Sequence, residues 1–283
     1  MSAPPCANHA DRMASAACAH CDRPICTECM RHAPVGWQCP DCIAAGAKKT
    51  KVIRPFANPG RTGIVGSTNP TPVVIGLIAA NVVVFVASGF GKSSVINRFG
   101  VLSHHVRQSD QYYRLFTAMF LHLSVLHIAS NMFTLLIVGP AVEVMLGKTR
   151  FLALYLIAGL GGSVASYLFS PANSVGAGAS GAIFGVMGAY VVLAHRRRQP
   201  LGVVVVLIAF NLVIGFTGGI DWRDHLGGLV VGLLLALLYE YAGELRQPAG
   251  RILLTVGSSL VVLAALGILL VAFPPENVTL LFS

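Results

Sequence analysis

Four polar side chains stand in otherwise apolar segments and could together carry out nucleophilic catalysis. Ser180 opens one such segment, His225 begins another, and His127 and Asn131 share a third. A serine hydroxyl becomes an effective nucleophile when a neighbouring base removes its proton, and imidazole can do so near neutral pH. We therefore expect Ser180 to be the nucleophile and His225 the general base of a catalytic dyad, without a cofactor.

His127 and Asn131 suggest how the charge that develops in such a reaction could be stabilised. They lie four residues apart and so share one face of a helix. Both can donate hydrogen bonds to the oxyanion that forms when serine attacks a peptide carbonyl, alongside the Ser180 backbone N–H at a helix N-terminus. The other interpretation is a polar pair that only holds neighbouring helices together.

No carboxylate is well placed to be a third catalytic residue. Asp224 immediately precedes His225, so on a helix the two side chains diverge by about 100°. We expect Asp224 and Asp221 to cap the N-terminus of that helix, where negative charge is favourable.

The elements that must position these side chains are apolar enough to cross a membrane. The chain is 55% hydrophobic and only 11% charged, far below the charged fraction of a soluble domain. The fold class that we expect is an all-α polytopic membrane protein. Its seven apolar segments are residues 72–90, 116–139, 151–169, 180–195, 201–217, 222–239 and 252–273.

Helical rise places the catalytic candidates in one layer of the bilayer. Ser180, His127 and His225 precede Arg196, Glu143 and Glu240 by similar numbers of residues. At 1.5 Å per residue, each lies roughly 22–24 Å from the charged residue that closes its segment. The hydrocarbon core is about 30 Å thick, so all three groups would lie several ångströms below the opposite face.

The basic residues predict how the chain lies in the cell membrane. With a cytoplasmic N-terminus, most of the 20 lysines and arginines fall on the inside, which is the orientation that the positive-inside rule favours. The C-terminus is then extracellular, and the catalytic layer faces the outer leaflet. The net charge of +9 indicates attraction to anionic lipid, and we expect no nucleic-acid partner.

All seven cysteines fall in the N-terminal segment, where their spacing predicts bound zinc. With His9 they form four pairs, each separated by two residues: Cys6 and His9, Cys18 and Cys21, Cys26 and Cys29, Cys39 and Cys42. Eight ligands suffice for two tetrahedral structural zinc ions. The gaps favour an interleaved arrangement, in which the first and third pairs share one ion and the second and fourth the other, but sequential pairing also fits. An odd number of cysteines and a reducing cytoplasm argue against disulfides.

The zinc ligand pattern resembles the B-box and related cross-braced zinc modules, for which we expect a cytoplasmic protein partner. The predicted domains are therefore a cytoplasmic zinc-binding domain at 1–45, a basic flexible linker at 46–70, a catalytic core at 71–245, and an additional transmembrane helix with a short outer tail at 246–283.

Five motifs in the membrane part resemble the rhomboid family of intramembrane serine proteases, over about residues 70–240. They are Tyr113-Arg114, the run from His122 to Asn131, the run from Gly139 to Gly147, Gly178-Ala179-Ser180-Gly181, and the run from His225 to Gly232. The resemblance implies a six-helix core to which the seventh segment is added. Many family members have tyrosine four residues after the serine, where this chain has Phe184, whose ring can still stack on His225.

The resemblance implies an intramembrane serine endopeptidase that uses a Ser-His dyad. Its expected substrates are single-span membrane proteins, cut within the lipid bilayer near the extracellular ends of their transmembrane segments, where helix-weakening residues help the segment to unwind. The alternative is a catalytically weak rhomboid-like protein that binds transmembrane helices. A solute transporter is disfavoured, because the predicted bundle interior lacks the charged ion sites that transporters use.

Overall fold

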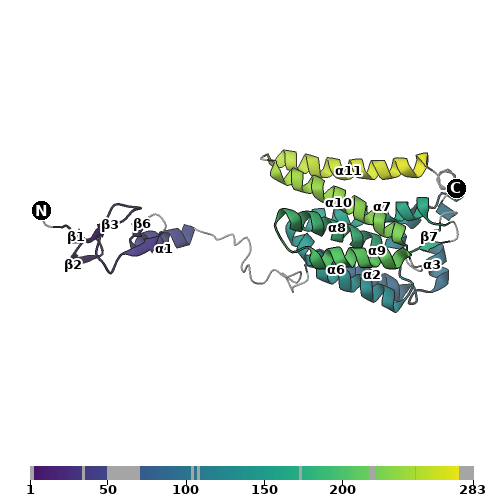
Figure 1. The fold of residues 1–283 in the computed structure, drawn as a ribbon, viewed down its shortest axis with the longest axis horizontal. Helices are drawn as coiled ribbons and strands as arrows, with labels where there is room; N and C mark the ends of the chain where they lie inside the picture. Colours follow the sequence, from purple (N-terminus) through teal and green to yellow (C-terminus); the bar gives the residue numbers. More distant parts are fainter. Residues whose placement is uncertain are drawn as a thin grey trace. The chain divides into compact units, whose positions relative to one another are not determined.

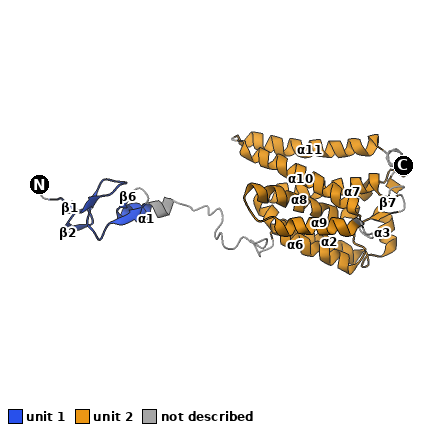
Figure 2. Cartoon of the chain, viewed as in Figure 1, with its two compact units in different colours: residues 1–59 blue, residues 60–283 orange. Residues whose placement is uncertain are grey.

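The computed structural model describes residues 3–33, 36–49, 71–102, 105–106, 109–171, 174–216, 221–245 and 247–273. The chain divides into two compact units, Met1–Pro59 and Gly60–Ser283 (Figure 2). Helix α1 (Pro40–Lys49) runs through the first residues of the predicted linker 46–70, so the start of that segment is helical. The rest of the linker and the predicted outer tail lie outside the described residues.

The first unit consists of three small antiparallel hairpins followed by α1. The hairpins pair β1 (Pro5–Cys6) with β2 (His9–Met13), β3 (Ala16–Ala17) with β4 (Pro24–Ile25), and β5 (Arg31–Ala33) with β6 (Gly36–Gln38). Its buried cluster consists of five cysteines and Ile25. A unit with so small an apolar core needs disulfides or metal ions to stay folded.

The second unit is a bundle of helices with short irregular connections (Figure 1). Its helices are α2 (Pro72–Ala87), α3 (Ser93–Phe99), α5 (Tyr113–Thr117), the 3₁₀ helix η1 (Ala118–Phe120), α6 (Val125–Leu146), α7 (Lys148–Phe169), α8 (Ser180–Arg196), α9 (Gly202–Phe216), α10 (Trp222–Glu244) and α11 (Pro248–Ala272). Each of the seven predicted apolar segments overlaps one of the longer helices. Among the described helices, α6, α7, α10 and α11 have the length and hydropathy to cross a bilayer, while α2 and α9 are apolar but shorter. The chain is a multi-pass membrane protein.

The prediction was wrong about where the second apolar helix begins. We expected a helix from residue 116, but α6 begins at Val125, after Ser124, whose hydroxyl accepts a hydrogen bond from the His127 N–H at 3.2 Å. Residues before it form the short helices α5 and η1, and Leu121 is extended. This N-cap places His127 in the first turn of α6.

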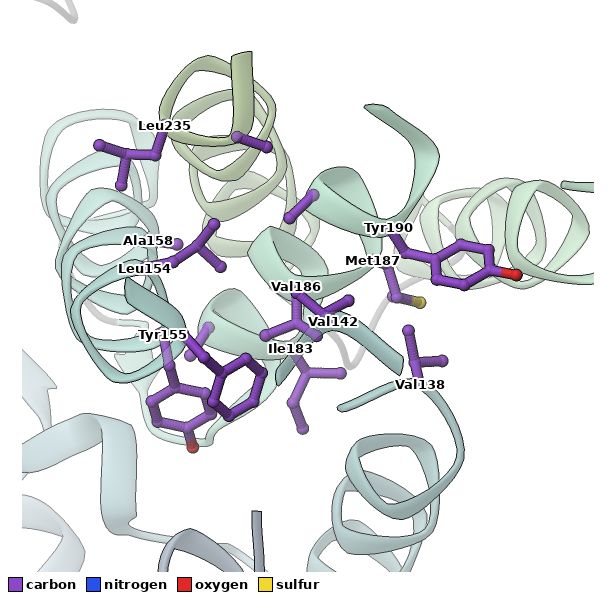
Figure 3. Close-up of a cluster of buried hydrophobic side chains, with 14 of the residues drawn as sticks. Val138, Val142, Leu154, Tyr155, Ala158, Ile183, Val186, Met187, Tyr190 and Leu235 are labelled. Carbon is purple, nitrogen blue, oxygen red and sulfur yellow. The ribbon is translucent and has the colours of Figure 1, made fainter. Parts of the chain in front are cut away.

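The bundle core surrounds α8, whose side chains are buried along most of its length. Figure 3 shows Ile183, Val186 and Met187 of α8 among side chains of α6, α7 and α10, including Val138 and Leu154. Helix α11 lies along one edge of the bundle (Figure 1), where it contacts α10 and α7. Helix α8 is therefore held on several sides.

Glycines allow α8 and α10 to touch through their backbones. A Cβ atom built on Gly228 would lie 2.0 Å from the Gly181 carbonyl oxygen, and one built on Gly232 would lie 2.2 Å from the Gly185 oxygen. Neither helix could carry a side chain at these positions without moving. These glycines therefore bring the two helix backbones into direct contact.

Glu143, near the end of α6, caps a different helix. Its carboxylate accepts hydrogen bonds from the Val73 and Val74 N–H groups, at 3.3 and 2.9 Å, and from the Thr71 hydroxyl. These amides belong to the first turn of α2, where a helix has no internal acceptors for its N–H groups. Glu143 therefore joins α6 to α2.

Candidate active site

The four side chains singled out in the sequence line a single cavity of about 400 Å³. Ser180 is the first residue of α8, His225 lies in the first turn of α10, and His127 and Asn131 lie in the first turns of α6. All three helices thus present their N-terminal ends to the cavity. Its other polar lining residues, which the sequence did not single out, include Ser130, Thr134, Ser163 and Asn211.

The segment that leads into Ser180 is fixed by backbone contacts. Strand β8 (Val175–Gly176) pairs antiparallel with β7 (Val101–Leu102), which lies between α3 and α5. The Gly178 N–H donates to the Ala118 carbonyl at 2.9 Å. Gly178 has φ +145°, and a Cβ atom there would lie 2.9 Å from Nε2 of His127 and 3.4 Å from Oγ of Ser180. Glycine at this position lets the chain pass directly beside both side chains.

His225 is held by an aromatic stack. The Phe184 and His225 rings are nearly parallel, with centroids 4.1 Å apart and an interplanar angle of 12°, so the predicted stacking is confirmed. The His225 side chain is almost fully buried, and its Nδ1 atom has no hydrogen-bond partner among the described residues. Stacking fixes the plane of the ring while leaving its nitrogens free for chemistry.

The Ser180 hydroxyl donates a hydrogen bond to a carboxylate of α10. Its Oγ atom lies 3.2 Å from Oδ2 of Asp224, and within the described part of the chain no hydrogen bond joins Ser180 to His225. The prediction that both carboxylates cap α10 is confirmed for Asp221 and wrong for Asp224. Asp221 alone accepts from the Arg223 and Asp224 N–H groups, at 3.2 and 3.4 Å, and thereby caps α10.

Asp221 also fixes the start of α10 to the end of α7. Its carboxylate accepts hydrogen bonds from the hydroxyls of Ser166 and Ser170, the latter at 3.1 and 3.2 Å. The first turn of α10, which carries His225 and Asp224, is thereby anchored to a second helix.

Asn131 has an unpaired donor beside His127 in the same cavity. The Asn131 side chain is 8% exposed, and its Nδ2 atom has no hydrogen-bond partner within the described ranges. The His127 ring packs edge-on against the buried ring of His122, with centroids 5.1 Å apart. A buried amide without an acceptor is costly, so a ligand oxygen in this cavity would find a donor ready for it.

In the first unit, the eight predicted zinc ligands form two groups of four. Cys6, His9, Cys26 and Cys29 make one group, and Cys18, Cys21, Cys39 and Cys42 make the other, with all ligand atoms of a group within 4.8 Å of one another. This is the interleaved arrangement, and the structure thus decides between the two pairings that the spacing left open.

The spacing of the ligand atoms fits a metal ion at the centre of each group. Two Sγ pairs are separated by 3.8 Å, Cys6 from Cys29 and Cys21 from Cys39. A tetrahedron with Zn–S bonds of 2.3 Å has edges of about 3.8 Å. The Nδ1 atom of His9 lies 3.2 and 3.5 Å from the sulfurs of Cys29 and Cys26. Both groups could therefore hold zinc.

Two thiols of the second group, those of Cys18 and Cys21, have lowered pKa values. The Cys39 N–H donates to the Cys18 sulfur at 3.2 Å, and this hydrogen bond lowers the pKa of Cys18 to about 6. The Arg23 side chain donates to the Cys21 sulfur at 3.4 Å and lowers the pKa of that thiol. Because thiolate is the form that binds metal, these contacts favour metal binding by Cys18 and Cys21, whereas the hydrogen bond to Cys39 raises the pKa of Cys42 to about 12.

Comparison with known proteins shows which family the membrane part of this sequence matches. Residues 109–242 match the Rhomboid domain. The chain is 42% identical over 154 residues to the rhomboid protease GluP of Bacillus subtilis, an alignment covering 52% of this chain and 30% of that protein. It is 33% identical over 183 residues to YdcA, a candidate rhomboid protease of Bacillus subtilis, covering 62% of this chain and 92% of YdcA. The rhomboid protease AarA of Providencia stuartii is 26% identical over 207 residues, which cover 63% and 74% of the two chains.

Coverage differs among these relatives. The match spans almost all of YdcA but less than a third of GluP. The matched Rhomboid domain begins at residue 109 and therefore excludes the zinc-ligand unit.

Proposed function

Because this chain belongs to the rhomboid family, we propose that it is an intramembrane serine endopeptidase that cleaves transmembrane segments of other proteins. The observation that carries the proposal is the shared cavity, lined by Ser180, His225, His127 and Asn131 at the N-terminal ends of three helices. Burying a hydroxyl, two imidazoles and an amide in a membrane bundle costs free energy. Such a cluster therefore indicates a functional site.

In this proposal Ser180 Oγ attacks the carbonyl carbon of the scissile peptide bond, and His225 accepts the serine proton. The carbonyl oxygen becomes an oxyanion, which the side chains of Asn131 and His127 and the Ser180 N–H stabilise by donating hydrogen bonds. His225 then delivers its proton to the leaving amine, and the acyl-enzyme forms. Water attacks that ester in the second half of the reaction, with His225 again as base.

We propose single-span membrane proteins as substrates, cut near their extracellular ends. Support comes from the distribution of lysine and arginine along the sequence, which favours a cytoplasmic N-terminus and an extracellular C-terminus in the cell membrane. In that orientation the N-terminal ends of α6, α8 and α10 face the outer leaflet. Water from outside then has a short path to the acyl-enzyme.

We further propose that the first unit is a B-box-like zinc domain that binds two structural zinc ions and a cytoplasmic partner. Support comes from the two groups of four ligands, in each of which the ligand atoms lie within 4.8 Å of one another. Each group has four protein ligands, so a metal there has no open position for substrate. The zinc ions would stabilise the domain and take no part in peptide hydrolysis.

The experiment that tests the proposal is cleavage of a single-span reporter that carries a small residue and a glycine near its outer membrane boundary. We expect wild type to cleave it and Ser180→Ala to be inactive but folded. Ser94→Ala is the matched control, because Ser94 is exposed on α3 and does not line the cavity, and it should keep activity. Cleavage by purified Ser180→Ala protein would refute the proposal that this protein is a serine protease.

The second candidate is a rhomboid-like protein that binds transmembrane helices with little catalysis. One observation favours it, since the Ser180 hydroxyl is bonded to Asp224 and not to His225. This candidate predicts that wild type retains the reporter in a detergent-stable complex and leaves Ser180 unlabelled by a fluorophosphonate probe. Labelling of wild type at Ser180 would exclude it.

A further inference from the structure

Asp224 is the one acidic side chain that touches the proposed nucleophile in the described structure. Its Oδ2 atom accepts the Ser180 hydroxyl hydrogen at 3.2 Å. It lies one residue before His225, so the same turn of α10 delivers both the imidazole and this carboxylate to the cavity. Sequence reasoning gave it no role at Ser180.

The surrounding backbone is shaped to admit this carboxylate. A Cβ atom on Gly181 would lie 2.7 and 2.8 Å from the two Asp224 carboxylate oxygens, and a Cβ atom on Gly162 would lie 2.6 Å from Oδ1. Both neighbouring helices therefore lack a side chain where Asp224 enters. The carboxylate also lies at the N-terminus of α8, where the helix dipole stabilises negative charge.

Asp221 leaves Asp224 free for this contact. Because Asp221 accepts the first N–H groups of α10 and the hydroxyls of Ser166 and Ser170, the helix is capped without Asp224. The third residue of α10 is therefore available to reach across to α8.

We propose that Asp224 is a positioning residue for the nucleophile, which holds Ser180 Oγ in the rotamer that faces the cavity. A serine side chain has three staggered rotamers, and a hydrogen bond to the carboxylate selects one. When substrate arrives, the hydroxyl hydrogen can turn from Asp224 to His225 by rotation about the Cβ–Oγ bond, with Oγ left in place. His225 remains the proton acceptor, so this inference rests on the proposed function.

Three variants separate positioning from the alternatives. Asp224→Ala removes the acceptor of a buried hydrogen bond. We therefore expect labelling of Ser180 by a small fluorophosphonate and kcat on the reporter to fall about ten- to hundredfold, with KM little changed. Asp224→Asn keeps an acceptor oxygen of the same reach and should stay within about fivefold of wild type. Asp110→Asn, on an exposed loop outside the cavity, is the matched control and should be unaffected. All rates are normalised to folded protein.

Other outcomes would overturn the proposal. Equal losses in Asp224→Ala and Asp224→Asn would mean that the carboxylate itself takes the serine proton. Faster labelling of Asp224→Ala would mean that Asp224 restrains the enzyme, and unchanged labelling would make the contact incidental.

A double-mutant cycle keeps the inference testable apart from activity. Thermal stability is compared for wild type, Ser180→Ala, Asp224→Ala and the double variant. If Asp224 holds Ser180, the double variant loses less stability than the two single losses together. Additive losses would refute the contact. A wild type that neither cleaves nor labels would refute the proposed function, while the cycle would still decide whether Asp224 holds Ser180.

Discussion

Gly228→Ala is expected to weaken the proposed reporter cleavage by disturbing the packing of two helices. The added Cβ atom would lie 2.0 Å from the Gly181 carbonyl oxygen and 2.6 Å from its carbonyl carbon, whereas ordinary contact begins near 3.4 Å. Backbone atoms cannot rotate away as a flexible side chain can, so α8 and α10 must separate by about 1.0–1.4 Å, which brings this contact to 3.0–3.4 Å. Overpacking of this kind costs about 1–3 kcal/mol of stability.

The larger consequence of Gly228→Ala is for catalysis. Ser180 and His225 lie on the two helices that must separate, next to the point of contact. Misplacement of reacting groups by 1 Å costs about 10² in rate. We therefore expect a folded protein whose kcat on the reporter falls about a hundredfold, with a modest loss of thermal stability.

Gly243→Ala provides the matched control for this prediction. Gly243 lies on the same helix, and a Cβ atom there would meet nothing within 4 Å. Alanine has the higher helix propensity, so this variant should be as active and at least as stable as wild type. Wild-type activity in Gly228→Ala would show that the two helices tolerate separation and that our reading of their contact is wrong.

Three further predictions concern individual groups. Asn131→Ala should lower kcat about 10²–10³-fold, because one donor to the oxyanion is lost while others remain. Phe184→Ala should lower kcat and thermal stability together, because it leaves the His225 ring without its stacking partner and opens a hole in a buried core. Elemental analysis should find two zinc ions per chain, and deletion of residues 1–45 should remove both while reporter cleavage continues.

For each of these predictions, a specific result would contradict it. Wild-type turnover in both Asn131→Ala and His127→Ala would reduce that pair to helix packing. Compared with Phe184→Ala, Phe184→Leu should recover more of the thermal stability than of the activity. Full activity in Phe184→Ala would show that stacking on His225 is not needed for cleavage. Less than one zinc per chain, or loss of catalysis in a well-folded truncation, would contradict the separation of the two units.

The sequence predicted the helices well because their signal is local. Runs of apolar residues mark all seven segments, and the residue that opens α8 was also the one whose motif drew attention. The start of α6 was misplaced because Phe116 and Leu121 are as apolar as the helix that follows. The boundary is set by Ser124, whose side chain accepts the His127 N–H and so caps the start of α6. This contact separates α6 from the short helices before it.

Contacts between elements were harder to predict than the elements. The angle of about 100° between neighbouring helical residues correctly separates Asp224 from His225, yet it says nothing about what lies opposite Asp224. That depends on Gly162 and Gly181 of two other helices. Similarly, ligand spacing allowed two pairings of the zinc groups, and only the course of the hairpins between them selects one.

The capping of α2 by Glu143 has a consequence for biogenesis. The N–H groups of Val73 and Val74 find their acceptor about seventy residues later in the chain. While the protein emerges from the ribosome, α2 therefore enters the bilayer with its first turn incomplete, and α6 brings the missing acceptor when it follows. A nascent chain arrested after Glu143 has left the ribosome can form this contact, whereas one arrested before Glu143 cannot. The contact between α2 and α6 thus joins two segments that are made at different times, and both precede α8 and its nucleophile in the chain.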